Sequence, residues 1–261
     1  MDCVRQGRRT TRGATTVAGA PAVDRKPWVT YTIIALNVAV YLVTVVLTRS
    51  IMNNGSAVLE RNWELFPPAV AAGQWWRLVT SGFVHFGLIH IGVNMASLWF
   101  IGRDLERFLG PLRYSVLYAL SLLGGSAGAY LLTFAIQTPS GLEYAASGGA
   151  SGAIFGVFGG ILILVLRLKI NPRQVIILLV VNLVFSFSVP HISWQAHIGG
   201  LITGALFAAA VVYAPAARRR MLQSGAAIVL LLVVLGLFAL RDAQLGPTVC
   251  NATYTLCQSR T

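Results

Sequence analysis

Apolar residues fall into seven long blocks, at about residues 28–48, 84–102, 112–136, 151–167, 173–190, 194–214 and 225–240. Most blocks reach the roughly 20 residues that an α-helix needs to cross a bilayer. The fourth, fifth and seventh are shorter, and the fifth also carries Asn182, Ser186 and Ser188. The pattern predicts an all-α membrane protein, a polytopic helical bundle with seven spans. Six spans with one peripheral helix is the alternative.

Composition agrees with a membrane protein and argues against several soluble classes. Of the 261 residues 56% are hydrophobic and 11% are charged, against roughly 45–50% and about 25% in an average soluble domain. Mean hydropathy is +0.71. A soluble fold needs more charge than this to cover its surface. The composition therefore excludes intrinsic disorder and a nucleic-acid scaffold, and it disfavours an ordinary cytosolic enzyme.

The net charge of +12 bears on topology, because Lys and Arg gather in cytoplasmic segments. With the N-terminus inside, 15 of the 20 Lys and Arg residues lie in inner segments and 5 in outer ones. The charges thus predict a cytoplasmic N-terminus and an outer C-terminus. Arg greatly outnumbers Lys beside much Ala and Gly, which favours a bacterial source and hence the plasma membrane.

This layout divides the chain into three parts. Residues 1–27 are a basic, flexible cytoplasmic segment, residues 28–214 a six-helix core, and residues 215–261 an inner basic linker, the seventh span and an outer tail. The long outer loop at about 49–83 is rich in aromatic residues, so we expect it to lie in the membrane interface. The link at 103–111 is expected to be a tight inner turn.

Polar side chains inside membrane spans are costly and mark candidate functional sites. Five of them are predicted to lie at one depth, just under the outer surface: His85, His90, Asn94, Ser151 and His197. A single such residue is ordinarily hydrogen-bonded glue between helices. Five groups at the same depth favour a site instead, and no Asp or Glu lies in any span.

The residues around Ser151 suit acyl transfer. Ser151 opens its span with Gly149 and Gly152 close by, and small neighbours let a substrate backbone approach the hydroxyl. A helix N-terminus also offers unpaired N–H donors for an oxyanion. With a histidine as base, these are the groups that the chemistry needs. Because the layer holds no acid, a dyad of Ser151 and His197 is favoured over a triad.

Small residues recur every four positions in two spans, a spacing that allows close helix packing. The two rows are Gly148, Gly152, Gly156 and Gly160, and Ala196, Gly200, Gly204 and Ala208. One row adjoins Ser151 and the other His197, so their packing would bring this pair together. Phe155, one turn below Ser151, either stacks on the His197 ring or only fills the core.

These residues resemble the rhomboid family of intramembrane serine proteases over about residues 28–214. The resemblance rests on four motifs in order, Trp76-Arg77, His85-x4-His90-x3-Asn94, Gly149-Ala150-Ser151-Gly152 and Ala196-His197-x2-Gly200-x3-Gly204. It implies a six-helix rhomboid core followed by a seventh C-terminal transmembrane helix, and it implies no cofactor.

The resemblance also implies roles for single residues. Ser151 would be the nucleophile and His197 the general base, while His90, Asn94 and the Ser151 N–H would form the oxyanion hole. His85 would be a structural histidine. Glu106 matches a family Glu on the inner turn, but Phe108 stands where the family usually has Arg, which puts the inner salt bridge in doubt.

The expected function is an intramembrane serine endopeptidase. Its expected partners are the transmembrane helix of a substrate and the lipid bilayer, and not nucleic acid. One alternative is a non-catalytic rhomboid-like protein that binds transmembrane segments. Another is a transporter or channel, whose polar site would be expected nearer the bilayer centre.

Three cysteines are too few for a disulfide scaffold. Cys3 alone could not hold a structural zinc ion, which takes about four ligands, and no metal is expected. Cys250 and Cys257 lie seven residues apart in the predicted outer tail. There they form either a disulfide, as an oxidising compartment allows, or two free thiols.

Overall fold

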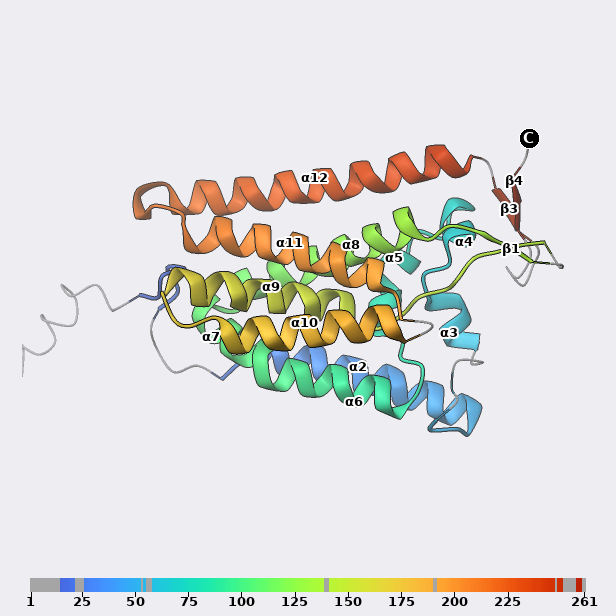
Figure 1. Ribbon diagram of the computed structural model, residues 1–261, viewed down its shortest axis with the longest axis horizontal. Helices are drawn as coiled ribbons and strands as arrows, with labels where there is room; N and C mark the ends of the chain where they lie inside the picture. The colour runs from blue at the N-terminus through green and yellow to red at the C-terminus, as the bar shows by residue number, and fades with distance from the viewer. Residues whose placement is uncertain are drawn as a thin grey trace, which may run out of the picture.

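The computed structural model describes residues 15–21, 26–52, 54, 58–138, 141–189, 192–246, 248–250 and 257–259. Its body is a bundle of helices that run side by side along the longest axis of the molecule (Figure 1). These helices are α2 (Trp28–Thr48), α6 (Leu88–Ser97), α7 (Arg103–Leu109), α8 (Pro111–Leu132), α9 (Ser151–Arg167), α10 (Arg173–Ser188), α11 (Trp194–Val212) and α12 (Arg219–Leu245). A π-helical turn, η2 (Leu98–Gly102), joins α6 to α7.

The short elements gather at one end of the bundle, which we call the loop end (Figure 1). They are α3 (Val58–Trp63), α4 (Pro67–Ala71), α5 (Arg77–Thr80) and η1 (Ser81–Phe83), with the antiparallel pairs β1 (Ile136–Thr138) with β2 (Gly141–Glu143) and β3 (Thr248–Cys250) with β4 (Cys257–Ser259). The 3-10 turn η3 (Ala216–Arg218) precedes α12 at the opposite end.

The bundle has the helices of a multi-pass membrane protein. Four stretches of the described chain are long and apolar enough to cross a bilayer, namely α2, α8, α11 and α12 with its preceding turn. The bent pair Arg77–Phe83 and Leu88–Leu109 counts as a fifth if it forms one span. Helices α9 and α10 are also apolar, but with 17 and 16 residues they are shorter than these stretches. The six-plus-one count of spans therefore stays a prediction.

Helices α8, α9 and α11 pack together at the centre of the fold. Their facing residues are small, so that a Cβ added to Gly156 of α9 would lie 2.0 Å from Ser121 Oγ of α8 and 2.9 Å from Gly200 O of α11. Helix α10 is different, because Leu179 and Ser186 are its only buried residues. The rest of α10 is exposed or half-buried, as suits a helix that faces lipid at the edge of a bundle.

The second apolar block departs from the predicted helix. Instead of beginning near residue 84, helix α6 begins at Leu88, and the two halves of the chain there meet at 92°. Gly87 makes the bend with a φ of 108°, a conformation that favours glycine. A side chain would not fit either, since a Cβ at Gly87 would lie 2.7 Å from Met52 O. His85 is consequently in the bend and not on the helix.

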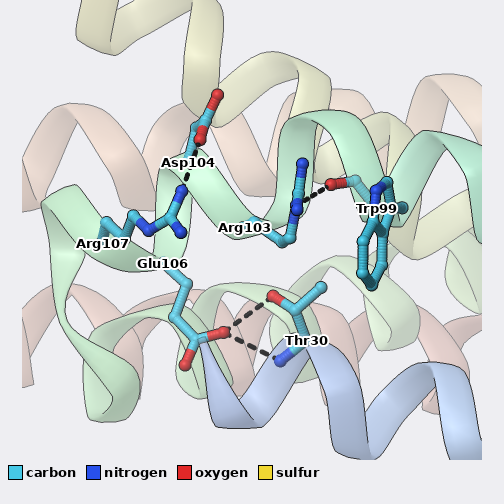
Figure 2. A network of polar contacts seen from close by, with 6 residues as sticks. All are labelled: Thr30, Trp99, Arg103, Asp104, Glu106 and Arg107. Atoms are coloured by element: carbon cyan, nitrogen blue, oxygen red, sulfur yellow. Dashed lines mark hydrogen bonds and ion pairs between the residues drawn. The ribbon is translucent and has the colours of Figure 1, made fainter. Parts of the chain in front are cut away.

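The link at 103–111 was expected to be a turn, but residues Arg103–Leu109 form α7. Glu106 is buried in this helix and accepts hydrogen bonds from the N–H groups of Val29 and Thr30 and from Thr30 Oγ1. Figure 2 shows the contact of Glu106 with Thr30 at the start of α2. A carboxylate satisfies the free N–H groups of a helix N-terminus and suits its dipole, so Glu106 needs no Arg partner. Arg107 pairs instead with Asp104 at 3.2 Å.

The opposite end of the bundle includes part of the segment that was expected to be flexible. Residues 15–21 form a closed turn in which Ala18 and Ala20 are buried. Gln223 of α12 donates to Ala18 O (3.3 Å) and to Val211 O (3.0 Å), and so joins this turn to α11 and α12. These contacts hold residues 15–21 against the bundle, while flexibility of the whole segment 1–27 stays a prediction. Cys3 lies outside the described residues.

The loop end is held by buried arginines. Arg77, which is 1% exposed, donates to Arg61 O and Glu64 O and, through Nε, to Gln74 Oε1. Arg241 of α12 donates to Tyr130 O (3.0 Å) and Thr133 O (2.9 Å), at the C-terminal end of α8. A cation suits the carbonyl groups that a helix leaves unpaired there. Helix α12 is thus fastened near both of its ends.

Candidate active site

Ser151 is the first residue of α9, and the loop before it sets its direction. Gly149 in that loop has a φ of +127°, which an L side chain rarely adopts. The Gly149 N–H donates to Ser81 O at 2.8 Å and ties the loop to η1. Ser151 therefore stands among the first N–H groups of a helix, which have no partner within the helix.

The side chains of Ser151 and His197 meet between α9 and α11, with Ser151 Oγ 2.7 Å from His197 Nε2. The two rows of small residues allow this approach. A Cβ added to Gly200 would lie 1.9 Å from Gly152 O, and one added to Gly204 would lie 2.4 Å from the Gly156 backbone. The packing that the four-residue spacing predicts is thus present.

The His197 ring is held on its face and on both edges. Phe155 stacks on it with ring centroids 4.1 Å apart and planes at 9°, so the stacking alternative for Phe155 is the one observed. On the edge away from Ser151, His197 Nδ1 lies 2.6 Å from Ser186 Oγ of α10. The sequence gives no sign of this partner, because a lone Ser in an apolar helix ordinarily bonds its own backbone.

His90 and Asn94 lie on one face of α6, as their spacing predicts. The Phe86 N–H donates to His90 Nδ1 at 3.4 Å, which leaves Nε2 as the protonated nitrogen of a neutral ring. A Cβ at Gly149 would lie 2.7 Å from His90 Nε2 and 3.6 Å from Ser151 Oγ, so these two atoms flank the same point. Asn94 is 5% exposed, and its amide nitrogen has no partner among the described residues.

His85 supports the site from outside. Its ring is fully buried, and Nε2 accepts the Ala150 N–H at 3.4 Å. The ring also meets the edge of the His90 ring, with centroids 5.0 Å apart. His85 therefore contacts both the loop that presents Ser151 and the histidine opposite. This position fits the structural role that the family resemblance implies.

One cavity of about 390 Å³ contains the side chains of Ser151, His197, His90 and Asn94 among its lining. Its walls come from the central helices, from α6 and α10, and from the loop before Ser151. Much of the lining is apolar, including Phe86, Ile89, Val93, Phe158 and Phe185. Among its lining residues that the structure describes there is no Asp or Glu.

Comparison with known proteins identifies the family of the chain. A family model described as the Rhomboid domain matches residues 72–214, more than half of the chain. "Rhomboid protease GluP" of Bacillus subtilis (strain 168) is 32% identical over 199 residues, which is 73% of this chain and 36% of GluP. "Rhomboid protease AarA" of Providencia stuartii is 27% identical over 206 residues, 71% of this chain and 73% of AarA.

A plant relative adds a contrast. "Inactive RHOMBOID-like protein 8" of Arabidopsis thaliana is 36% identical over 147 residues, which is 54% of this chain and 39% of that protein. The chain thus spans little more than a third of the length of GluP and of this inactive relative. Similarity alone therefore does not separate active from inactive relatives, and the site residues must do so.

Proposed function

This chain belongs to the rhomboid family, and from that membership we propose that it is an intramembrane serine endopeptidase. It cleaves a transmembrane segment of a membrane protein by a dyad of Ser151 and His197. The observation that carries the proposal is the 2.7 Å contact between Ser151 Oγ and His197 Nε2 inside a cavity. Relatives named as rhomboid proteases support it.

The reaction proceeds in two halves. His197 Nε2 takes the hydroxyl proton as Ser151 Oγ attacks the scissile carbonyl carbon, and a tetrahedral intermediate forms. Collapse of the intermediate breaks the C–N bond, and His197 returns the proton to the leaving amine. Water then attacks the acyl-enzyme, with His197 again as base, and regenerates the Ser151 hydroxyl.

The negative charge of the intermediate falls where donors converge. The Ser151 N–H, at the start of α9, is one donor, and the Asn94 amide and His90 Nε2–H are the others. Donors fixed before the reaction act where charge develops, in a site shielded from water. This is the oxyanion hole that the family resemblance implies.

The substrate and the setting follow from the same site. A peptide must be extended to offer its carbonyl to Ser151, whereas a regular helix engages its carbonyls in hydrogen bonds. The preferred substrate is thus a transmembrane helix that unwinds easily near its outer end. We place the protein in a bacterial plasma membrane, with residues 28–214 as the catalytic core, the N-terminus inside and the tail after α12 outside.

The second candidate function is a rhomboid-like protein that binds transmembrane segments without cleaving them. The specific observation in its favour is the relative named as inactive, which matches more than half of this chain. A binder would need neither a free Ser151 hydroxyl nor a basic His197.

Purified protein separates the two functions. A fluorophosphonate probe, which phosphonylates an activated serine with loss of fluoride, should label the wild type, and a single-span substrate should be cut. Ser151→Ala and His197→Ala should abolish both signals while expression stays intact. Ser188→Ala, on an exposed position of α10, is the matched control and should behave as the wild type. Cleavage by purified Ser151→Ala would end the proposal, and an unlabelled, inactive wild type would favour the binder.

A further inference from the structure

Ser186 of α10 makes two short polar contacts at the back of the His197 ring. Its Oγ lies 2.6 Å from His197 Nδ1 and 2.6 Å from the carbonyl oxygen of Asn182, one helical turn earlier. Ser186 is 2% exposed, and it is one of only two buried residues of α10. Its hydroxyl is thus the point at which α10 touches the dyad.

The protons on these atoms can be assigned by counting. A hydroxyl has one proton, and a carbonyl oxygen can only accept. Two oxygens 2.6 Å apart need a proton between them, so the Ser186 hydroxyl donates to Asn182 O. The contact with His197 then needs a proton from the ring, which means that Nδ1–H donates to Ser186 Oγ. A neutral ring protonated at Nδ1 has its lone pair on Nε2, 2.7 Å from Ser151 Oγ.

We propose that Ser186 is a positioning residue that keeps His197 in the tautomer able to accept the Ser151 proton. The proposal rests on the proposed function where it concerns turnover, but the tautomer itself does not depend on activity. In a serine protease triad an acid performs this task, and its replacement by an amide leaves the wrong tautomer. Here the cavity lining that the structure describes contains no acid.

A neutral hydroxyl suits this place for an energetic reason. A carboxylate beside His197 would have to be buried within the bundle, which costs several kcal/mol unless it is well paired. The Ser186 hydroxyl accepts from Nδ1 without bringing a charge. Phe155 already fixes the plane of the ring by stacking on its face, so a hydrogen bond at Nδ1 fixes the remaining choice, which nitrogen carries the proton.

The competing explanation is that Ser186 only joins α10 to α11, as serines commonly do between membrane helices. The two explanations differ in what removal of the hydroxyl changes. Loss of a simple interhelical bond lowers stability and leaves the tautomer as it was. Loss of a positioning bond shifts the proton between the ring nitrogens and lowers kcat, with the substrate still bound.

The first experiment reads the tautomer directly. Protein with ¹⁵N-labelled imidazole rings contains four histidines, and the His197 signals are those absent from His197→Gln. At a pH where the ring is neutral, the wild type should show a protonated Nδ1 and a bare Nε2. In Ser186→Ala the Nε2-protonated form should gain population. A bare Nδ1 in the wild type, or an unchanged spectrum in Ser186→Ala, would overturn the proposal.

The second experiment measures cleavage of a single-span substrate in detergent. In Ser186→Ala, kcat should fall about 10- to 30-fold, as deletion of one hydrogen bond in a catalytic unit implies, with KM within twofold. Ser186→Thr keeps the hydroxyl and should recover most of kcat. Ser188→Ala removes the same group from an exposed position of α10 and should match the wild type.

The outcomes separate this inference from the proposed function. An unchanged kcat in Ser186→Ala, or a loss confined to KM, would overturn the positioning role. If the wild type neither cleaves nor reacts with the fluorophosphonate probe, the proposed function fails, and the tautomer spectrum still decides the role of Ser186. If Ser186→Ala does not fold, the wild-type spectrum alone overturns the proposal when it shows the Nε2-protonated ring.

Discussion

Asn94 has hydrogen-bonding capacity that the folded chain does not use. Its side chain is 5% exposed, and its amide nitrogen has no partner among the described residues. Leaving a buried donor unsatisfied costs about 1–3 kcal/mol, so such groups call for an explanation. The cavity wall beside Ser151 provides one, because an oxyanion formed there would supply the missing acceptor.

We expect Asn94→Ala and His90→Ala to lower kcat much more than they raise KM. Donors to an oxyanion act mainly in the transition state, and removal of one costs roughly 10²–10³-fold in a soluble protease. Each single loss should be partial, since the Ser151 N–H would still donate. Steady-state kinetics on a single-span substrate, with Asn171→Ala on the exposed turn before α10 as control, measures the effect. Unchanged turnover in both variants would make this face of α6 structural only.

At the scale of elements, the position of the dyad depends on how closely α9 and α11 approach. Gly200 and Gly204 leave no room for a methyl group, because an added Cβ would lie within 2.4 Å of α9 backbone atoms. The helix backbones are therefore in direct contact beneath Ser151 and His197. A larger residue at either position must therefore push the two backbones apart at that point.

Gly204→Ala should reduce proteolysis by about 100-fold and lower the thermal unfolding midpoint. A displacement of about 1 Å at a catalytic pair can cost ~10²-fold in rate. Gly236→Ala is the matched control, since an added Cβ on that residue of α12 meets nothing within 4 Å. Full activity in Gly204→Ala would show that α9 and α11 tolerate separation, and that the small-residue row does not set the distance between Ser151 and His197.

The short helix α3 at the loop end carries a buried carboxyl group, that of Glu60. Glu60 is fully buried, and neither carboxylate oxygen has a partner among the described residues. Burial, with a smaller contribution from nearby Glu64, raises the pKa of Glu60 to about 7. The native state therefore keeps a proton that the unfolded chain loses near pH 4.5, the ordinary pKa of the group.

This difference predicts that the protein loses stability as the pH rises from about 4.5 to about 7. Over that range the native state binds more protons than the unfolded state, so the slope of the unfolding free energy with pH is negative. Glu60→Gln removes the contribution of Glu60, while Glu64, whose pKa burial raises to about 6, keeps its own. The unfolding midpoint of Glu60→Gln should exceed that of the wild type at pH 8. Thermal unfolding between pH 5 and pH 8 measures this, with Asp104→Asn at an exposed ion pair as control. Parallel curves for Glu60→Gln and the wild type would exclude Glu60 as the source.

At the scale of the whole molecule, the chain returns to the loop end after α12, where β3 pairs with β4 (Figure 1). The register sets Cys250 directly opposite Cys257 on neighbouring strands. Directly paired residues of antiparallel strands have Cα atoms about 4.5–5.5 Å apart, which lies within the range that a disulfide bridges. The backbone arrangement therefore favours the bonded alternative over two free thiols.

We expect Cys250 and Cys257 to form a disulfide outside the membrane, and the same test reports the topology. In a Cys3→Ser variant, a membrane-impermeant thiol reagent should label intact cells only after reduction. The bond should stabilise the tail locally, by at most about 2–3 kcal/mol, because the enclosed loop is short. Labelling of intact cells without reduction would show free outer thiols. Labelling only after lysis would place the tail inside and contradict the seven-span topology.

The regular spacing of apolar and small residues predicted the membrane helices and the contact between two of them. The apolar blocks located the long helices to within about six residues at each end, and the four-residue rows predicted the contact that joins Ser151 to His197. The bend at Gly87 was not predictable, because it depends on a positive φ and on contact with the distant Met52 carbonyl. Helix α7 was not predicted, because its charged residues are typical of an inner turn. The contact that buries one of them, from Glu106 to the start of α2, joins residues far apart in the sequence.

Ser186 is a residue of the candidate site that the sequence could not predict. Its neighbours on α10 are apolar and mostly exposed, so nothing in the pattern separates it from Ser188 two positions later. Only the packing of α10 against α11 gives one of them a histidine partner. Such a contact is a property of the fold and cannot be read from spacing within one helix.

The glycine contact between α9 and α11 also bears on temperature. Hydrophobic stabilisation weakens on cooling, but lipid tails are as apolar as the side chains, so that force does not hold membrane helices together. The contact of Gly200 with Gly152 and of Gly204 with Gly156 rests instead on dispersion between closely packed backbone atoms. That attraction is enthalpic and does not fade in the cold. The spacing of Ser151 and His197 should therefore be kept at low temperature, where only the intrinsic rate of the chemical step slows.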